Sequence, residues 1–382
     1  MKTLSYVKIN TNKLIYTSVL IIVCIPFLFY WIGIQKLFSS PLSIGITSAI
    51  LSVCLFSVYR TAFNGRDLLI LYVCVSFLYL NNSIYGNMGA NLTLFNIIAL
   101  LIIFNNTTFT KKQIERIRII TAVFLFTFLI TIKIEPHYDS ILVYTIRGDE
   151  FNSNVFGMFI LALYFQIFLY FENKLKSNFI KLMFFTTITF FAFKYINISN
   201  SRSSLISIGI FLILYIVKIV NLRNYRKMLF CMIIVILIVP FIYLSVIKYI
   251  EKIELFEKSI FTRSTVWEST INLIKSHPII GCGTRPDIML DSGGYTTSAH
   301  NVFLGVWKTI GIVPLITLMI YLVRGKNIKY VSKENYLAKK AFLCCMLVCI
   351  FETMLNDSDI YIFFITLLMT IRENETEKKY DT

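Results

Sequence analysis

The chain has 382 residues, of which 57% are hydrophobic and 15% are charged, whereas about 25% of the residues of a soluble protein are charged. The net charge of +16 would suit a nucleic-acid-binding protein. The basic residues lie in short loops between apolar runs, however, which is the pattern of membrane topology. The composition therefore excludes a soluble fold and a nucleic-acid partner, and it predicts a single integral membrane domain over residues 1–382.

The apolar runs predict about twelve transmembrane helices, and hence an all-α polytopic membrane protein. They lie at residues 14–34, 41–59, 68–84, 90–104, 117–134, 153–171, 180–198, 203–220, 228–247, 301–323, 341–355 and 358–371. The first run is too long for a signal-peptide core and has no small-residue cleavage site behind it, so we expect it to be retained. The last two runs are short and form either two helices or one broken helix.

The distribution of Lys and Arg predicts the orientation of the chain. With a cytoplasmic N-terminus, the termini and the cytoplasmic loops hold 25 of the 37 basic residues, in agreement with the positive-inside rule. This predicts a multi-pass protein of the bacterial inner membrane with both termini in the cytoplasm. Two longer segments, 135–152 and the large extracytoplasmic loop 248–300, then lie outside and hold all three histidines: His137, His277 and His300.

The large loop contains a helix signature. Thr265, with Glu268 three residues later, fits a capping box at a helix start. The apolar residues that follow recur at helical spacing and form one stripe: Trp267, Ile271 and Ile274. The pattern predicts an amphipathic helix that lies either at the outer membrane surface or packed against the rest of the protein.

Two residues at the predicted outer ends of helices are candidate site residues. Arg202, in SNSRSSLISIG, is either a snorkelling anchor or an anion-binding group. Anchoring arginines lie mostly inside, which favours the second reading. His300, in SAHNVFLGVWKTIGIVP, either caps a helix or accepts a proton from a hydroxyl group. Ser298 can cap the start of this helix at a lower cost, which favours the role of His300 as a proton acceptor.

Other charged residues have a weaker case. Arg263 lies four residues before Trp267 and forms either a cation–π or surface ion pair, or an anion site. Arg285, in GCGTRPD, has the same alternatives, with the surface role favoured. Lys308 and Glu352 lie at membrane depth, where we expect a buried structural ion pair.

Motifs of nucleotide and metal chemistry are absent from the sequence. It contains no P-loop, HExxH or GxSxG motif, and no CxxC pair. Only Cys282 of the eight cysteines lies in a long loop; the others lie in apolar runs, where Cys behaves as a small hydrophobe. The sequence therefore predicts no metal, no cofactor and no use of ATP.

Four segments together resemble one family. They are TRSTVWESTINLIKSHPIIGCGT, with an arginine, a tryptophan and an HP…GxG turn; SAHNVFLGVWKTIGIVPLI, with an HN pair; SNSRSSLISIG; and FNSNVFGMFI. They are similar to the signature of the O-antigen ligase and polymerase superfamily, bacterial membrane enzymes that move lipid-linked glycans. The large loop is compact for this family.

The resemblance implies a metal-independent, inverting glycosyl transfer on the outer face. The donor would be a glycan on undecaprenyl diphosphate, and the acceptor a hydroxyl group. By motif match, His300 takes the role of general base, and Arg202, Arg263 and, more weakly, Arg285 bind the diphosphate. Guanidinium groups suit phosphate oxygens for such a role.

Several functions remain open. A ligase would use a lipid A-core acceptor in lipopolysaccharide biosynthesis, and a polymerase would use a growing glycan; both would work among membrane lipids. A polar turn at Asn356, Asp357 and Asp359 resembles one in ligases and favours the ligase. A glycolipid transporter would show internal repeats and charges along a central path. A structural partner would not need Arg and His at outer helix ends.

Overall fold

The computed structural model describes residues 11–31, 41–62, 65–107, 109–131, 133–136, 142–146, 149–151, 153–199, 201–216, 225–250, 261–284, 288–289, 295–296, 299–324 and 333–350. Within these residues the chain is mostly helical. The helices are α1 (Thr11–Trp31), α2 (Pro41–Ala62), α3 (Gly65–Tyr85), α4 (Met88–Asn106), α5 (Lys111–Thr131), α6 (Ser153–Lys174), α7 (Asn178–Ile198), α8 (Arg202–Ile216), α9 (Tyr225–Ile250), α10 (Phe261–Ser276), α11 (Val302–Ile310), α12 (Ile312–Val323) and α13 (Lys333–Val348).

The helices other than α10 overlap the predicted apolar runs as far as residue 350, α10 lies in the large loop, and the run at 358–371 lies outside the described residues. Among the described helices, α3, α4, α7 and α9 are long and apolar enough to cross a membrane, and five shorter apolar helices accompany them. These helices fit a membrane protein. The number of twelve spans stays a prediction.

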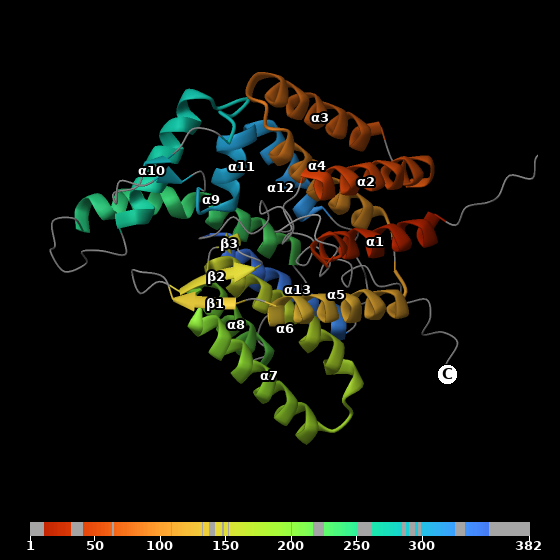
Figure 1. Cartoon of the computed structure of the whole chain (residues 1–382). Coiled ribbons are helices and arrows are strands. Elements are labelled where there is room, and N and C mark those ends of the chain that lie inside the picture. The colour runs from red at the N-terminus through yellow and green to blue at the C-terminus, as the bar shows by residue number, and fades with distance from the viewer. Residues whose placement is uncertain are drawn as a thin grey trace, which may run out of the picture.

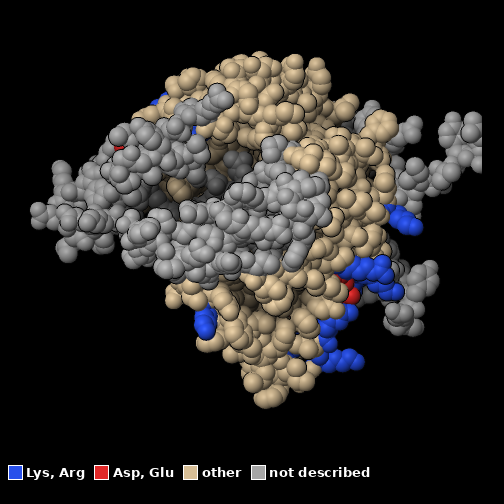
Figure 2. Space-filling view, viewed as in Figure 1, with Lys and Arg blue, Asp and Glu red and all other residues tan. Residues whose placement is uncertain are grey.

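Most helices run roughly side by side between two ends of the molecule (Figure 1). The start of α1 lies at one end, on the right of the view, and α10 lies at the opposite end. Most of the Lys and Arg side chains drawn in this view gather along the right-hand edge, and the described surface that faces the viewer elsewhere carries few charges (Figure 2). This asymmetry fits the predicted positive-inside distribution.

Ion pairs join neighbouring helices in the segments predicted to be cytoplasmic. The pairs are Glu115–Lys174 at 3.1 Å, Glu172–Lys181 at 3.7 Å and Asp67–Arg324. Each pair links helices whose ends meet on that side, namely α5 with α6, α6 with α7 and α3 with α12.

Short strands add to the expected all-helical architecture. β1 (Lys133–Pro136), β2 (Leu142–Ile146) and β3 (Asp149–Phe151) form an antiparallel sheet in the predicted outer segment. β4 (Ile288–Met289) and β5 (Tyr295–Thr296) form a two-stranded ladder in the large loop. The all-α prediction was incomplete here, because it was drawn from apolar runs, whereas the central strand LVYTI is rich in β-branched and aromatic residues.

The predicted tenth span is two helices rather than one. α11 ends at Ile310, and α12 begins at Ile312 after Gly311, whose φ of 100° breaks the helix. Irregular backbone at membrane depth is tolerated where protein surrounds it, and Gly311 is buried.

Candidate functional site

His300 lies two residues before α11, beside its N-cap, and has a left-handed backbone. Its φ is 45°, and it is the one non-glycine residue with positive φ among the described residues. This left-handed conformation is uncommon for L-residues, although Asn, Asp and His adopt it more often than the others, and it costs free energy that the surroundings must offset. The question is therefore what fixes the backbone at this residue.

The next residue, Asn301, provides the main anchor. Its side chain is fully buried, and its Oδ1 accepts hydrogen bonds from the amides of Phe303 at 3.1 Å and Leu304 at 3.0 Å, so Asn301 is the N-cap of α11. Its Nδ2 donates to Ile236 O in α9 at 2.9 Å and to Ile350 O after α13 at 3.2 Å. One amide therefore joins three helices at the start of α11. The predicted cap, Ser298, was wrong, because the adjacent Asn301 satisfies the first amides of the helix.

The bond to Ile236 has a physical origin in α9. Pro240 lies inside this helix and has no N–H, so the carbonyl four residues earlier loses its helical donor. That carbonyl belongs to Ile236, and Asn301 Nδ2 supplies the missing hydrogen bond. A buried carbonyl without a donor would be costly in a membrane, so Pro240 and Asn301 complement each other.

Arg202 is the first residue of α8, and its side chain is exposed. The small residues around it allow close helix packing. Ser201 lies so near α6 that a Cβ added at Gly157 would overlap its side chain. Ser201 Oγ also donates to Ser204 Oγ at 3.0 Å. The structure thus brings together the FNSNVFGMFI and SNSRSSLISIG segments.

Helix α13 connects the Arg202 and His300 regions. Ser207 Oγ donates to Cys344 O at 2.7 Å, and Lys340 Nζ donates to Leu214 O. The later residue of α8, Leu214, is paired with the earlier residue of α13, Lys340, so the two helices are antiparallel. The start of α8 therefore lies near the C-terminal end of α13.

The start of α11 lies at the same end of α13. Val302 N donates to Cys349 O at 3.1 Å, next to the bond from Asn301 to Ile350 O. Cys349 is five residues beyond Cys344, about 7.5 Å along a helix, and Arg202 precedes Ser207 by the same number of residues. Arg202 and His300 are thus both positioned around the end of α13.

Helix α10 packs inside the protein, as one of the two alternatives predicted. Its stripe contacts α9 and α11: Trp267 is fully buried, lies edge-on to Tyr243 with ring centroids 5.0 Å apart, and belongs to a cluster with Val266 and Leu304. The predicted capping box was wrong, because the helix begins at Phe261 and Thr265 lies inside it. The stretch before Thr265 contains no Gly or Pro that would stop the helix.

The remaining predicted residues lie partly or wholly outside the described residues. Arg263 falls in the first turn of α10, but its side chain is not among those described. Arg285 and Glu352, the expected partner of Lys308, also lie outside them, as do His137 and the turn at Asn356, Asp357 and Asp359. Their roles stay predictions.

The HPIIGCGT turn closes the break between α11 and α12. The last carbonyls of a helix lack donors within it, and here the turn supplies them: Cys282 N donates to Lys308 O at 2.7 Å and Gly283 N to Thr309 O at 3.1 Å. A helix in lipid has no water to satisfy these groups. The turn therefore stabilises a helix break at the opposite end of α11 from His300.

Helix α3 adds a second layer to this junction. Asn81 Nδ2 donates to Ile280 O at 2.8 Å and to Thr309 O at 2.9 Å. Asn87, which precedes α4, accepts hydrogen bonds from Thr284 N at 3.2 Å and from Thr284 Oγ1 at 2.8 Å. The large loop is thereby tied to α3 and α4.

Cys282 and Lys308 are both buried at this junction. Burial raises the pKa of the Cys282 thiol, and the nearby Lys308 ammonium opposes the shift. The thiol donates to Lys308 O at 3.2 Å. Cys282 therefore acts as a structural donor here.

Replacing Gly281 or Gly311 with alanine will lower the apparent Tm of the protein. Both have positive φ, and a Cβ at Gly281 would lie 2.7 Å from Ile310 N, while one at Gly311 would overlap Ile279 O. Backbone atoms cannot move aside as a side chain can. The measurement is the apparent Tm of the detergent-solubilised protein.

Gly209→Ala in α8 is the control, since its Cβ would meet no atom within 4 Å. We expect it to leave the Tm unchanged or to raise it slightly, because Ala favours a helix over Gly by about 1 kcal/mol. Equal losses in all three variants would contradict the clash argument.

Among the described residues, no group of three or more His, Cys, Asp or Glu side chains is placed to hold a metal ion. The residues that sequence reasoning missed are Asn81, Asn87, Asn301 and Pro240. Their signal was available, since polar residues and proline within or beside apolar runs require compensating hydrogen bonds.

Residues 187–319 match the model of the O-antigen ligase family (Wzy_C). The matched segment covers about a third of the chain and contains Arg202, α10, the HPIIGCGT turn and His300. No curated protein and no solved structure matches the chain. The match confirms the resemblance to the O-antigen ligase superfamily, whose members are glycosyltransferase-like enzymes.

Proposed function

We propose, from the match of residues 187–319 to the O-antigen ligase family, that this chain is an O-antigen ligase of the bacterial inner membrane. It transfers a glycan from undecaprenyl diphosphate to a hydroxyl group of lipid A-core on the periplasmic face. The observation that supports the proposal is that the starts of α8 and α11, which carry Arg202 and His300, both lie at the C-terminal end of α13.

The proposed reaction is a direct displacement. The acceptor hydroxyl oxygen attacks the anomeric carbon, and the bond from this carbon to the diphosphate oxygen breaks. The hydroxyl proton passes to the imidazole of His300, and the lipid diphosphate leaves with the electron pair. One displacement inverts the anomeric carbon, and it requires no metal ion.

Charge develops at two positions during this displacement. The leaving diphosphate gains negative charge, which a guanidinium group stabilises through paired hydrogen bonds. Arg202 has an exposed side chain at the site and takes this role, joined in the proposal by Arg263 and, with less support, Arg285. The left-handed backbone of His300 and the anchoring of its neighbour Asn301 support a fixed position for the base.

The test is the lipopolysaccharide pattern of a strain that lacks the gene. We expect free lipid A-core, with polymer accumulating on its lipid carrier. The wild-type gene restores the ladder. Arg202→Ala does not restore it, and Arg202→Lys restores it in part, because a lysine keeps the charge but lacks the planar fork.

Other patterns give different answers. Lipid A-core bearing a single repeat unit would identify a polymerase, which uses the same donor with a growing glycan as acceptor. An unchanged ladder would contradict both functions and favour transport or a structural role. Equal amounts of each variant in the membrane fraction are the control.

A further inference from the structure

Helix α3 has one face toward the protein and one face away from it. It lies at the upper edge of the molecule in Figure 1 and is long and apolar enough to cross a membrane. It packs against α4, α11 and α12, and its buried residues include Cys74 and Asn81. On the opposite face, five exposed residues follow one another at alternating intervals of three and four positions. We call them the α3 stripe: Leu69, Tyr72, Ser76, Tyr79 and Ser83.

Four of these five residues carry a hydroxyl group, although hydrocarbon offers such a group no hydrogen-bond partner. Tyr72 and Tyr79 are 70% and 74% exposed. They lie three and four residues from the middle of α3, or about 4.5–6 Å along the helix. The interfaces in which tyrosine is common begin about 15 Å from the middle of a bilayer. The α3 stripe therefore places two phenol groups at a depth where lipid cannot satisfy them.

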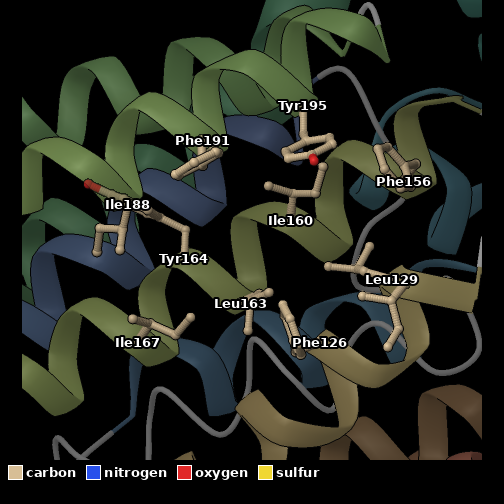
Figure 3. A pocket seen from close by; sticks show the side chains of 12 residues that line it. Phe126, Leu129, Phe156, Ile160, Leu163, Tyr164, Ile167, Ile188, Phe191 and Tyr195 are labelled. Atoms are coloured by element: carbon tan, nitrogen blue, oxygen red, sulfur yellow. The ribbon is translucent and has the colours of Figure 1, made fainter. Parts of the chain in front are cut away.

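Other tyrosines in the apolar helices have their hydroxyl groups paired within the protein. Tyr164 lies on the wall of a groove between α5, α6 and α7 (Figure 3), and its hydroxyl oxygen is 3.1 Å from Thr189 Oγ1. Tyr215 Oη donates to Glu172 Oε2 at 3.0 Å. A protein surface that covers the α3 stripe would provide the same kind of pairing.

We propose that the α3 stripe is the interface of a homodimer, in which the α3 helices of two copies lie side by side. Copies in one membrane have the same orientation, so a two-fold axis along the membrane normal brings the stripe onto itself with both helices parallel. The alternating interval of three and four residues is the repeat of two parallel helices that cross at a small angle. Ser76 and Ser83 allow the two backbones to approach closely, as small residues do in membrane interfaces.

The hydroxyl groups of the stripe complement one another. Ser76 Oγ donates to Tyr72 O at 2.9 Å, and Ser83 Oγ donates to Tyr79 O at 3.0 Å. A hydroxyl group has one donor and two acceptor lone pairs, so each serine oxygen can still accept a hydrogen bond. Side chains of a helix point back toward its N-terminus, which brings the Tyr79 hydroxyl of one copy level with Ser76 of the other. This bond forms twice across the two-fold axis, so a second copy satisfies both phenol groups at position 79.

The exposed area of this face also suits a dimer. A tyrosine buries about 150–250 Å², so four tyrosines that are about 70% exposed supply on the order of 400–700 Å² to a pair. Specific interfaces bury about 1,200 Å² or more in total. Exposed apolar residues flank the stripe on both sides and bring the pair into this range: Leu68, Val73, Val75 and Leu80.

The first test is disulfide formation in native membranes. On oxidation, we expect Ser76→Cys and Ser83→Cys each to shift from the mass of one chain to that of two on a non-reducing gel. Ser245→Cys in α9 is the matched control, because Ser245 is also exposed and donates to Phe241 O at 2.9 Å. We expect this variant and the wild-type protein to keep the mass of one chain. No crosslinked product from either α3 variant, or a product with a different protein, would overturn the homodimer.

A second test measures the mass of the purified protein in lipid nanodiscs or mild detergent by light scattering. We expect wild type to be a dimer and Ser76→Leu/Ser83→Leu to be a monomer, because leucine keeps the backbones apart. Ser245→Leu is expected to remain a dimer. Tyr79→Phe keeps the ring and removes both bonds across the axis, so we expect it to raise the Kd of the dimer by about tenfold. A monomeric wild type, or leucine variants that stay dimeric, would overturn the proposal. Neither test depends on glycan transfer, so each outcome is separate from that of the proposed function.

Discussion

His300→Asn will lower the rate of glycan transfer by about a hundredfold to ten-thousandfold, the usual contribution of a positioned general base. Asparagine is the informative replacement because it tolerates the left-handed backbone that His300 adopts. It cannot accept the proton from the acceptor hydroxyl. His300→Ala also adds backbone strain of about 1–2 kcal/mol. A lower transfer rate in that variant alone could therefore come from misfolding as well as from the missing base.

His277→Asn is the matched control. His277 is exposed at the end of α10, and its Nδ1 lies 2.9 Å from Ser276 Oγ. We expect it to keep the wild-type rate. The measurement is the initial rate in proteoliposomes across a range of pH, with the folded fraction checked by size-exclusion chromatography. A folded His300→Asn variant with the wild-type rate and pH profile would exclude His300 as the base.

Asn301→Ala will destabilise the protein by about 4 kcal/mol or more, because four buried polar groups are left without partners at a cost of about 1–3 kcal/mol each. Four backbone groups lose a partner in this variant: the carbonyls of Ile236 and Ile350 and the amides of Phe303 and Leu304. The apparent Tm in detergent is the measurement. The exposed Asn197 of α7 is the control position, where alanine should have little effect.

A double-mutant cycle isolates the bond to α9. Asn301→Asp keeps the oxygen that caps α11 and loses the donor to Ile236 O. In a Pro240→Ala background, residue 240 regains an N–H that satisfies this carbonyl within the helix. We therefore expect Asn301→Asp to be less destabilising there than in wild type, with a coupling energy of about 1 kcal/mol. Identical costs in both backgrounds would show that Asn301 and Pro240 act independently.

The positions of the helices were readable from the sequence because they depend on local composition. A run of apolar residues between basic loops must form a helix in lipid, where each backbone group needs a partner within its own segment. The asymmetry of Lys and Arg follows from the same local counting. For the same reason, Arg202 and His300 stood out as polar residues at the ends of apolar runs.

Local sequence patterns predicted helix boundaries less well where a distant segment contributes to the structure. The start of α10 was misplaced because a capping-box pattern does not reveal that residues 261–264 continue the helix. The predicted tenth span was drawn as one helix, since a single Gly311 in an apolar run does not by itself predict a break. The break is stable because the 279–283 turn supplies the hydrogen bonds that the helix ends lack.

The sequence by itself thus indicated a membrane protein and predicted that most of its basic residues lie on one side, and it contained the segments that resemble the O-antigen ligase family. Only the tertiary structure decided that α10 packs on α9 and α11, that Asn301 completes the hydrogen bonding of α9, and that α8 and α11 start at the same end of α13. The packing of α10 depends on apolar contacts of Trp267, and the other two features depend on single hydrogen bonds between residues far apart in the chain, such as Ser207 with Cys344 and Asn301 with Ile236. Periodicity and composition describe one segment at a time, so they carry no information about which distant carbonyl an amide will meet.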